Sequence, residues 1–492
     1  MTTQPDVAPS VTEYDDAFIA GRWTPATGEA VLSVVNPATE QVIATVREAS
    51  SADVRAAVDA ARAAFDDGPW AQTTPDDRAA VLDAIADALD KRAEQVTALQ
   101  TAEVGAPTAF SQASHGRAVG CLRYYAQQAR EFPFRTDRPR ADGKITRILQ
   151  QPVGVVAAIA PWNGPLAVAC LKMGPALAAG CTVVLKPAPE TPFTAMVLAD
   201  IIAELVDAGQ MPAGVVNVIN GGREIGAELV ANPGVDKISF TGSTAAGSRI
   251  MASVADRIGR VTLELGGKSA AIILDDADLD QVLPSLIPGS CGNTGQMCFA
   301  LTRVLVSERR HDEIVAAIAD GMEKLSVGDP TAPGTFMGPL AMQRQRERVE
   351  EYFELARSEG ARVVTGGKRP AGLDVGYYIE PTLLTDVGSD SRIAQEEIFG
   401  PVLSVITYRD IDDAIRIANN SDYGLSGAIY TADIESGYAI AQRIRTGTIS
   451  VNGSVFDTTV PFGGFKKSGI GREGGPEGMH PFLETKSVHM PD

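Results

Sequence analysis

The sequence is short of positive charge. Its 492 residues include 43 Lys and Arg against 62 Asp and Glu, which gives a formal net charge of -19. Nucleic acids and anionic membrane surfaces are both bound through clustered Lys and Arg, so we expect neither as a partner. An acidic surface mainly aids solubility and leaves the fold undetermined.

Cysteine is scarce too. The chain holds five, namely Cys121, Cys170, Cys181, Cys291 and Cys298, with no CxxC pair and no Cys/His cluster at zinc spacing. This pattern is typical of reduced thiols in a cytosolic protein, and it offers no metal site. We therefore expect a cytoplasmic protein that binds no metal.

Long hydrophobic runs are missing as well. The longest apolar stretch, residues 164–185, is broken by Lys172, Gly174, Pro175 and Gly180. A buried helix followed by a strand accounts for this stretch better than a membrane span. Residues 1–16 are polar and lack the basic and apolar regions of a secretory signal, and we expect them to be frayed.

What the chain does contain is an alternation of helices and buried strands. Hydrophobic residues make up 45%, and the length corresponds to about three domains at roughly 150 residues each. The spacing of apolar residues predicts one helix over 51–65 and one over 76–104. From residue 153 the short apolar runs VGVVAAIAP, CTVVLKP, VVNVING and KISFTGS alternate with helical segments, which predicts a parallel, doubly wound sheet. RVTLELGG and AAIILDDAD begin a second series, so we expect two α/β domains.

Three polar side chains stand in Gly-rich turns or at strand ends, where ligands bind parallel sheets. Cys298 in GNTGQMCFA could expose its sulfur beside a dipole that lowers its pKa. Glu264 in VTLELGGKS could have a raised pKa and act as a base, and Asn163 in APWN could donate to an oxyanion. Each also fits a plainer explanation, as a buried thiol, a turn cap or a turn residue. The segment TGSTAAG, with Gly242 and Ser243, is equally consistent with a pyrophosphate site or a simple helix cap.

The combination is more specific than its parts. Seven motifs follow in order, APWN, KPAPETP, FTGSTAAG, LELGGKS, GQMC, EEIFGPV and PFGGFKKSGIGRE, with Glu264 and Cys298 34 residues apart. By these motifs the chain resembles the aldehyde dehydrogenase superfamily of the hydrolytic, non-acylating type, over nearly its whole length. The resemblance implies NAD(P)-dependent oxidation of an aldehyde to a carboxylic acid, through a thiohemiacetal and a thioester on a cysteine.

The resemblance also implies roles for individual residues. Cys298 would be the nucleophile, Glu264 the base for deacylation, and Asn163, with the backbone N–H of Cys298, the oxyanion hole. Lys186 resembles the lysine that binds the adenosine ribose, and we group it with the catalytic residues as well. Residues expected at the cofactor are Ile159, Pro161, Trp162, Lys186, Gly242, Ser243, Leu265, Gly266, Glu397 and Phe399. Those expected along the substrate tunnel are Gly164, Leu171, Met297, Phe299, Phe456 and Phe462.

Two departures from the family pattern bear on specificity. Many NAD-preferring members carry an acid three positions after the ribose-binding lysine, where this chain has Pro189, with Glu190 one position later. We favour NAD and leave NADP open. Gly164 and Leu171 stand where the family often has bulky rings, which indicates a roomy, apolar tunnel. A medium-sized hydrophobic aldehyde, aromatic or terpenoid, is therefore expected rather than a small or charged one.

Three other functions are weighed against this one. A CoA-acylating aldehyde dehydrogenase needs no hydrolytic base, so Glu264 favours hydrolysis. A catalytically silent binding protein on the same fold should have lost one of the three central residues, and all three are present. A hydrolase with a histidine base would have to use His115, His311, His480 or His489, none of which lies in a recognisable nucleophile motif, although a sequence does not show spatial proximity.

The expected fold class is α/β, aldehyde dehydrogenase-like, with two doubly wound α/β domains and a small β bridging or oligomerisation element. We assign 1–130 and 149–262 to a cofactor-binding domain, 263–462 to a catalytic domain, and 131–148 with 463–492 to the bridging element. Residues 132–149 and the tail after Gly475 fit neither sheet and could pair with a neighbouring subunit. The family forms dimers or tetramers in this way, so a homodimer or homotetramer is implied.

Overall fold

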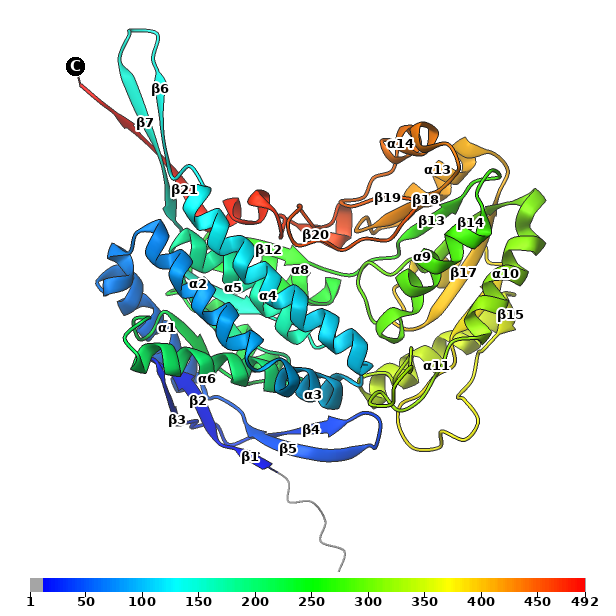
Figure 1. Ribbon diagram of the computed structural model, residues 1–492, viewed down its shortest axis with the longest axis horizontal. Helices are drawn as coiled ribbons and strands as arrows, with labels where there is room; N and C mark the ends of the chain where they lie inside the picture. The colour runs from blue at the N-terminus through cyan, green and yellow to red at the C-terminus, as the bar shows by residue number, and fades with distance from the viewer. Residues whose placement is uncertain (1–11, 492) are drawn as a thin grey trace, which may run out of the picture.

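The computed structural model describes residues 12–491, which form two large sheets flanked by helices and two small sheets (Figure 1). The first large sheet has eight strands in the order β20-β12-β11-β8-β9-β10-β2-β3. Its five central strands are parallel: β8 (Val155–Ile159), β9 (Thr182–Lys186), β10 (Val216–Val218), β11 (Lys237–Thr241) and β12 (Arg260–Glu264). Antiparallel strands close the edges: β2 (Asp16–Ile19), β3 (Arg22–Pro25) and β20 (Gly469–Ile470).

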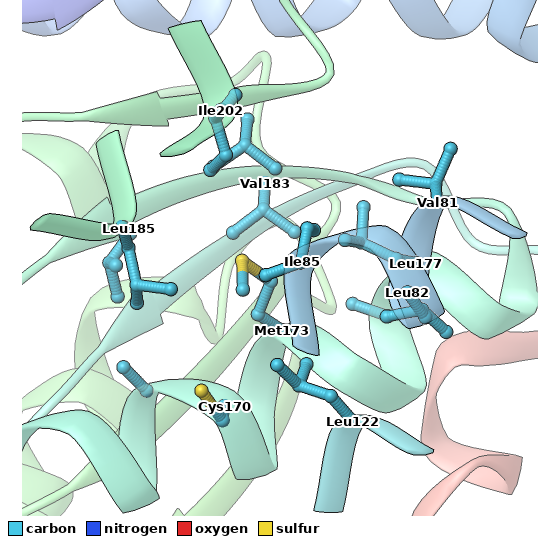
Figure 2. Packing of buried hydrophobic residues seen from close by; sticks show 14 of the residues in the cluster. Val81, Leu82, Ile85, Leu122, Cys170, Met173, Leu177, Val183, Leu185 and Ile202 are labelled. Carbon is cyan, nitrogen blue, oxygen red and sulfur yellow. The ribbon is translucent and has the colours of Figure 1, made fainter. Parts of the chain in front are cut away.

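Helices cover both faces of this sheet. They are α1 (Ser51–Asp66), α2 (Pro75–Asp90), α3 (Ala93–Val104), α4 (Thr108–Glu131), α5 (Pro165–Ala179), α6 (Phe193–Asp207), α7 (Arg223–Ala231) and α8 (Thr244–Val254). Alternate residues of a strand point to opposite faces, so β8 contributes Val156 to the core under α2, α4, α5 and α6, and Val155 to the core under α1, α7 and α8. Figure 2 shows the first of these cores, where Ile85 of α2, Leu122 of α4 and Met173 of α5 pack towards Val183 of β9.

The second large sheet has seven strands in the order β15-β16-β17-β14-β13-β18-β19. Its bounds are β13 (Ala270–Ile273), β14 (Arg303–Ser307), β15 (Arg362–Thr365), β16 (Thr382–Thr385), β17 (Val402–Tyr408), β18 (Gly427–Tyr430) and β19 (Ser450–Val451), of which β15 alone is antiparallel. One face packs on α9 (Leu279–Cys291) and α10 (His311–Glu323), and the other on α11 (Gln343–Ser358), α12 (Arg392–Gln395), α13 (Ile411–Asn419) and α14 (Ile434–Ala441). Both sheets are therefore doubly wound, as the alternating pattern predicts.

Two small sheets complete the fold. One joins β1 (Thr12–Tyr14), β5 (Gln41–Arg47) and β4 (Val31–Asn36). The other is antiparallel, with β7 (Ile145–Pro152) between β6 (Arg135–Pro139) and β21 (Leu483–His489), and it projects from one corner of the molecule (Figure 1). Residues 132–149 and the C-terminal tail thus pair with each other within the chain. Short 3₁₀ turns are η1 (Pro69–Gln72), η2 (Gly292–Gly295), η3 (Glu308–Arg310), η4 (Lys466–Ser468), η5 (Pro476–Gly478) and η6 (His480–Phe482).

Three sequence expectations are corrected here. Residues 76–104 form two helices, because the chain turns at Lys91 and Arg92 and each helix then buries its own apolar face. The run RVTLELGG does not begin the second sheet, since β12 pairs in parallel with β11 and the change of sheet follows Glu264. The expected fraying of 1–16 is wrong for β1 and the start of β2, which are held by β5 and β3, while residues 1–11 lie outside the described residues.

Candidate active site

One cavity of about 850 Å³ collects nearly all the residues predicted for the site. Strand ends of the first sheet, the first turn of α5 and the segment after α9 meet around it. Its wall includes Pro161, Trp162, Asn163, Gly164, Leu171, Gly242, Ser243, Glu264, Leu265, Gly266, Met297, Cys298, Phe299, Glu397, Phe399, Phe456 and Phe462. The two exceptions, Ile159 and Lys186, are paired opposite each other at the ends of β8 and β9.

The loop before Cys298 has an unusual backbone. Asn293, Thr294 and Gly295 have φ values of 49°, 57° and 70°, so three consecutive residues are left-handed. Such conformations cost about 1–3 kcal/mol each for residues other than glycine and persist where the surroundings impose them. Gly267 provides one constraint, because a Cβ at this position would lie 2.4 Å from the carbonyl oxygen of Cys298. The LELGGKS turn and the cysteine loop can therefore approach each other closely only with glycine at 267.

Asn163 is tied to the same loop. Its Nδ2 donates a hydrogen bond to the backbone carbonyl oxygen of Gln296 at 2.8 Å, and the backbone carbonyl oxygen of Asn163 accepts one from Nδ2 of Asn293 at 3.0 Å. One N–H of the Asn163 amide is used in this way, and the second is free to donate into the cavity. The geometry can supply a neutral hydrogen-bond donor next to the thiol.

Glu264 is buried at the end of β12, with 2% of its surface exposed and no hydrogen-bond partner for either carboxylate oxygen among the described residues. Burial raises its pKa well above the usual value, the charge of Glu473 raises it further, and Lys172 and Arg472 lower it. The expectation of a raised pKa at Glu264 is confirmed in direction. An unpartnered buried carboxyl that faces a cavity is suited to proton transfer.

A buried ion pair lies next to this carboxyl. Lys172 Nζ donates to Glu473 Oε1 at 2.6 Å and to Thr241 Oγ1 at 2.7 Å, and Ser239 Oγ also donates to Glu473 at 3.2 Å. The two side chains of the pair are 0% and 4% exposed. This pair was not recognised from the sequence, although Lys172 interrupts a continuous apolar helix, where a charge needs a partner.

Cys298 is partly exposed as a residue and lines the cavity. Burial raises its pKa, Glu264 and Glu397 add to the increase, and the backbone N–H groups of Cys298 and Phe299 oppose it. The expectation of a lowered pKa is therefore wrong for this structure, because desolvation and two nearby carboxyls outweigh the dipoles of the loop.

The wall beside Trp162 and Phe399 fits a dinucleotide. These rings meet edge to face with centroids 5.2 Å apart, and they provide an apolar contact for a planar ring. Helix α8 begins here, capped by Ser243, and its first backbone N–H groups are suited to a pyrophosphate. Glu397 accepts a hydrogen bond from Gly267 N at 3.0 Å, and burial raises its pKa to about 7. Its second oxygen is available for ribose hydroxyls.

Lys186 does not line this cavity. Its ammonium donates to the carbonyl oxygens of Pro187, at 2.7 Å, and Gly221. Burial lowers its pKa to about 8, with an opposing effect from Glu190 and Glu48. Glu190 is in turn paired with Arg344. The role of Lys186 at the adenosine ribose stays a prediction.

Three phenylalanines form an aromatic part of the cavity wall. Phe299 and Phe456 stack with their planes 4° apart and centroids at 5.3 Å, and Phe462 meets Phe456 edge on at 5.0 Å. Sequence reasoning missed Phe110, Ser114 and Arg117 of α4, which also reach this cavity, since nothing in a helical sequence shows which face of the helix meets a distant site. Among residues 12–491, no group of three or more His, Cys, Asp or Glu side chains could hold a metal ion, and none of the helices has the length and apolar character to cross a membrane.

Comparison with known proteins agrees with this geometry. A family model described as the aldehyde dehydrogenase family matches residues 23–488. The geranial dehydrogenase of Castellaniella defragrans is 44% identical over 480 residues, which cover 97% of this chain and 99% of that protein. The crystal structure of Mycobacterium tuberculosis aldehyde dehydrogenase complexed with NAD+ has a TM-score of 0.95 and 47% identity, covering 98% of this chain and 99% of that one. A Pseudomonas syringae aldehyde dehydrogenase C mutant, complexed with NAD+ and octanal, has a TM-score of 0.92 and 39% identity, covering 96% of each chain. The chain therefore belongs to the aldehyde dehydrogenase family of NAD(P)-dependent oxidoreductases, which confirms the family, the fold class and the enzyme class that its motifs predict.

Proposed function

We propose that this protein oxidises an aldehyde to a carboxylic acid with NAD, through a thioester on Cys298. The observation that carries the proposal is the convergence of Cys298, Glu264 and Asn163 on one cavity. These residues come from three separate parts of the chain, and their functional groups match a nucleophile, a base and an oxyanion donor.

Each residue has a defined step. Cys298 Sγ attacks the aldehyde carbon as a thiolate, and the C=O electrons move to oxygen, where Asn163 Nδ2 and the Cys298 backbone N–H stabilise the charge. NAD, when bound, accepts the hydride that leaves this carbon, so the thiohemiacetal becomes a thioester. Glu264 then takes a proton from water, whose oxygen adds to the thioester and expels the Cys298 thiolate.

Two observations support NAD as the cofactor. The residues around Trp162, Ser243 and Glu397 fit a dinucleotide, and the two structural relatives described above were determined with NAD+. One position leaves NADP open as well. The residue three after Lys186 is Pro189, so no acid stands there to repel the 2′-phosphate of NADP. A direct comparison of kcat/KM with NAD and NADP tests this choice.

Glu264 distinguishes hydrolysis from transfer of the acyl group to CoA. A CoA-acylating enzyme needs no base for water, yet here a buried, unpartnered carboxyl faces the cavity that contains Cys298. We therefore expect the free acid as product. Acyl-CoA formed in the presence of CoA, with no acid, would favour the alternative.

The test follows reduced-cofactor absorbance with purified protein, NAD and a panel of aldehydes. Wild type should turn over, and Cys298→Ala should bind NAD but show no turnover. Glu264→Gln should give a burst of NADH equivalent to the enzyme and then stop, because the thioester accumulates. Binding of NAD without any turnover in wild type would point to the silent binding protein.

For the substrate, we propose a medium-sized aldehyde with an apolar body, aromatic or terpenoid. The wall formed by Phe299, Phe456 and Phe462 supports this class, and geranial, the terpenoid aldehyde in the name of the Castellaniella relative, belongs to it. Citral and benzaldehyde should exceed acetaldehyde in kcat/KM. Equal values for acetaldehyde and the bulky aldehydes would remove the basis for this proposal.

We also propose a cytoplasmic homodimer or homotetramer. All five cysteines are free, which agrees with a reducing compartment. Strand β6 pairs with β7 alone among the described strands, and its five residues are exposed, so its outer edge can accept a strand from another subunit. Light scattering at several protein concentrations measures the assembly.

A further inference from the structure

Two arginines line the cavity, Arg117 and Arg348, and the reaction above uses neither of them. Arg117 of α4 reaches the cavity together with Phe110 and Ser114 of the same helix. Its guanidinium lies 5.5 Å from the centroid of the Phe110 ring. The side chain is half-buried rather than extended into solvent.

The guanidinium of Arg117 has no hydrogen bond or ion pair to any of residues 12–491. The other arginine of the cavity wall, Arg348, donates to the carbonyl oxygen of Glu397 at 2.6 Å. Burial lowers the pKa of Arg117, and no anion opposes this effect. A desolvated guanidinium without a partner is unfavourable, so an anion that enters the cavity would be stabilised there.

The position of Arg117 follows from the packing of α4 on α5. The ring of Tyr125 lies 3.0 Å from where a Cβ on Gly174 would stand, and Cys170 lies close enough to Cys121 to add to the increase in the pKa of Cys121. Cys121 and Cys170 each lie four residues before Tyr125 and Gly174. The next step of four residues along both helices therefore places Arg117 beside the first turn of α5. This turn lies between Gly164 and Leu171, both predicted for the substrate tunnel, and its residues Ala167 and Val168 line the cavity.

We propose that Arg117 binds a carboxylate at the end of the substrate remote from the aldehyde group. The preferred substrate class is then an aldehyde with an apolar body and a distal carboxylate. This inference rests on the proposed function and narrows its substrate, from an aldehyde with an apolar body to one that also carries a distal carboxylate. A guanidinium can donate two parallel hydrogen bonds to a carboxylate, and contact with the Phe110 ring restricts its orientation.

The test compares two aldehydes of nearly the same shape, 4-carboxybenzaldehyde and 4-carbamoylbenzaldehyde, with NAD. Because hydrogen bonds to charged groups change binding by about ten- to hundredfold, wild type should favour the carboxylate by at least about tenfold in kcat/KM. Arg117→Met should abolish this preference mainly through KM, and Arg117→Lys should restore part of it. Arg123→Met is the matched control, since Arg123 lies on the same helix but pairs with Asp87 and Asp90 outside the cavity.

A second readout does not depend on turnover of the carboxylate substrate. Terephthalate, the product of 4-carboxybenzaldehyde, should inhibit oxidation of benzaldehyde by wild type, and about tenfold less strongly in Arg117→Met. Two results would overturn the inference while leaving the proposed function intact. One is that wild type has nearly equal kcat/KM for 4-carboxybenzaldehyde and 4-carbamoylbenzaldehyde, and the other is that terephthalate inhibits wild type and Arg117→Met equally. If wild type oxidised none of these three aldehydes, that result would instead contradict the proposed function.

Discussion

Replacement of Lys172 by methionine tests the buried network behind the base. In the wild type, Lys172 Nζ donates to Glu473, Thr241 and Ser239, and the side chains of the ion pair are 0% and 4% exposed. Lys172→Met leaves the carboxyl of Glu473 buried without its cation. Removal of one partner of a buried pair costs about 3–5 kcal/mol of the free energy of unfolding.

The expected shift in melting temperature follows from the length of the chain. Unfolding entropy is about 2.1 cal/mol/K per residue, so for 492 residues unfolding as one unit the loss corresponds to about 3–5 °C. Thermal unfolding by circular dichroism, at one protein concentration and neutral pH, measures it. The double variant Lys172→Met with Glu473→Met should recover much of the loss, since both charges are gone. A shift below about 1 °C for the single variant, or additive losses in the double, would refute the reasoning.

Three further predictions concern the reaction. Glu473→Gln removes a charge that raises the pKa of Glu264, so the rising limb of kcat against pH should move to lower pH, because Glu264 is a base only when ionised. Asn163→Ala removes one oxyanion donor and should lower kcat by about 10²–10³, measured by steady-state kinetics. Gly267→Ala places a Cβ 2.4 Å from the Cys298 carbonyl oxygen, so the cysteine loop should shift and kcat should fall.

Each of these has an outcome that contradicts it. If the rising limb of kcat against pH does not move in Glu473→Gln, the charge of Glu473 does not affect the pKa of Glu264. A loss under fivefold for Asn163→Ala would exclude its amide from the oxyanion site. Gly120→Ala in α4 serves as the control for Gly267→Ala, because a Cβ at 120 meets nothing within 4 Å. Equal activities of the two alanine variants would refute the close approach of the loops.

The local sequence was sufficient to predict the strands and the central residues. Runs such as CTVVLKP and KISFTGS are apolar over the length of one strand and end in turn residues, and both form buried parallel strands, β9 and β11. Cys298, Glu264 and Asn163 were singled out because the seven motifs that include them follow one another in the order of the family, since each motif alone also fits a plainer explanation. Asn163 and Glu264 reach the cavity because β8 and β12, which they follow or end, are parallel strands whose carboxyl ends lie at one edge of the sheet, whereas Cys298 is brought there by the loop after α9.

Other features were decided only by the tertiary structure, because they join residues with no local relation. Lys172 and Glu473 are 301 positions apart, and their pairing follows from the packing of the C-terminal segment on α5. The pKa of Cys298 is raised rather than lowered because the residue is buried and because two carboxyls of other elements, Glu264 and Glu397, lie near it. The place of Arg117 in the cavity depends on the register of α4 against α5, and helical spacing alone does not fix this register. The sequence thus determined which chemical groups are available, and long-range packing decided which of them act on one another.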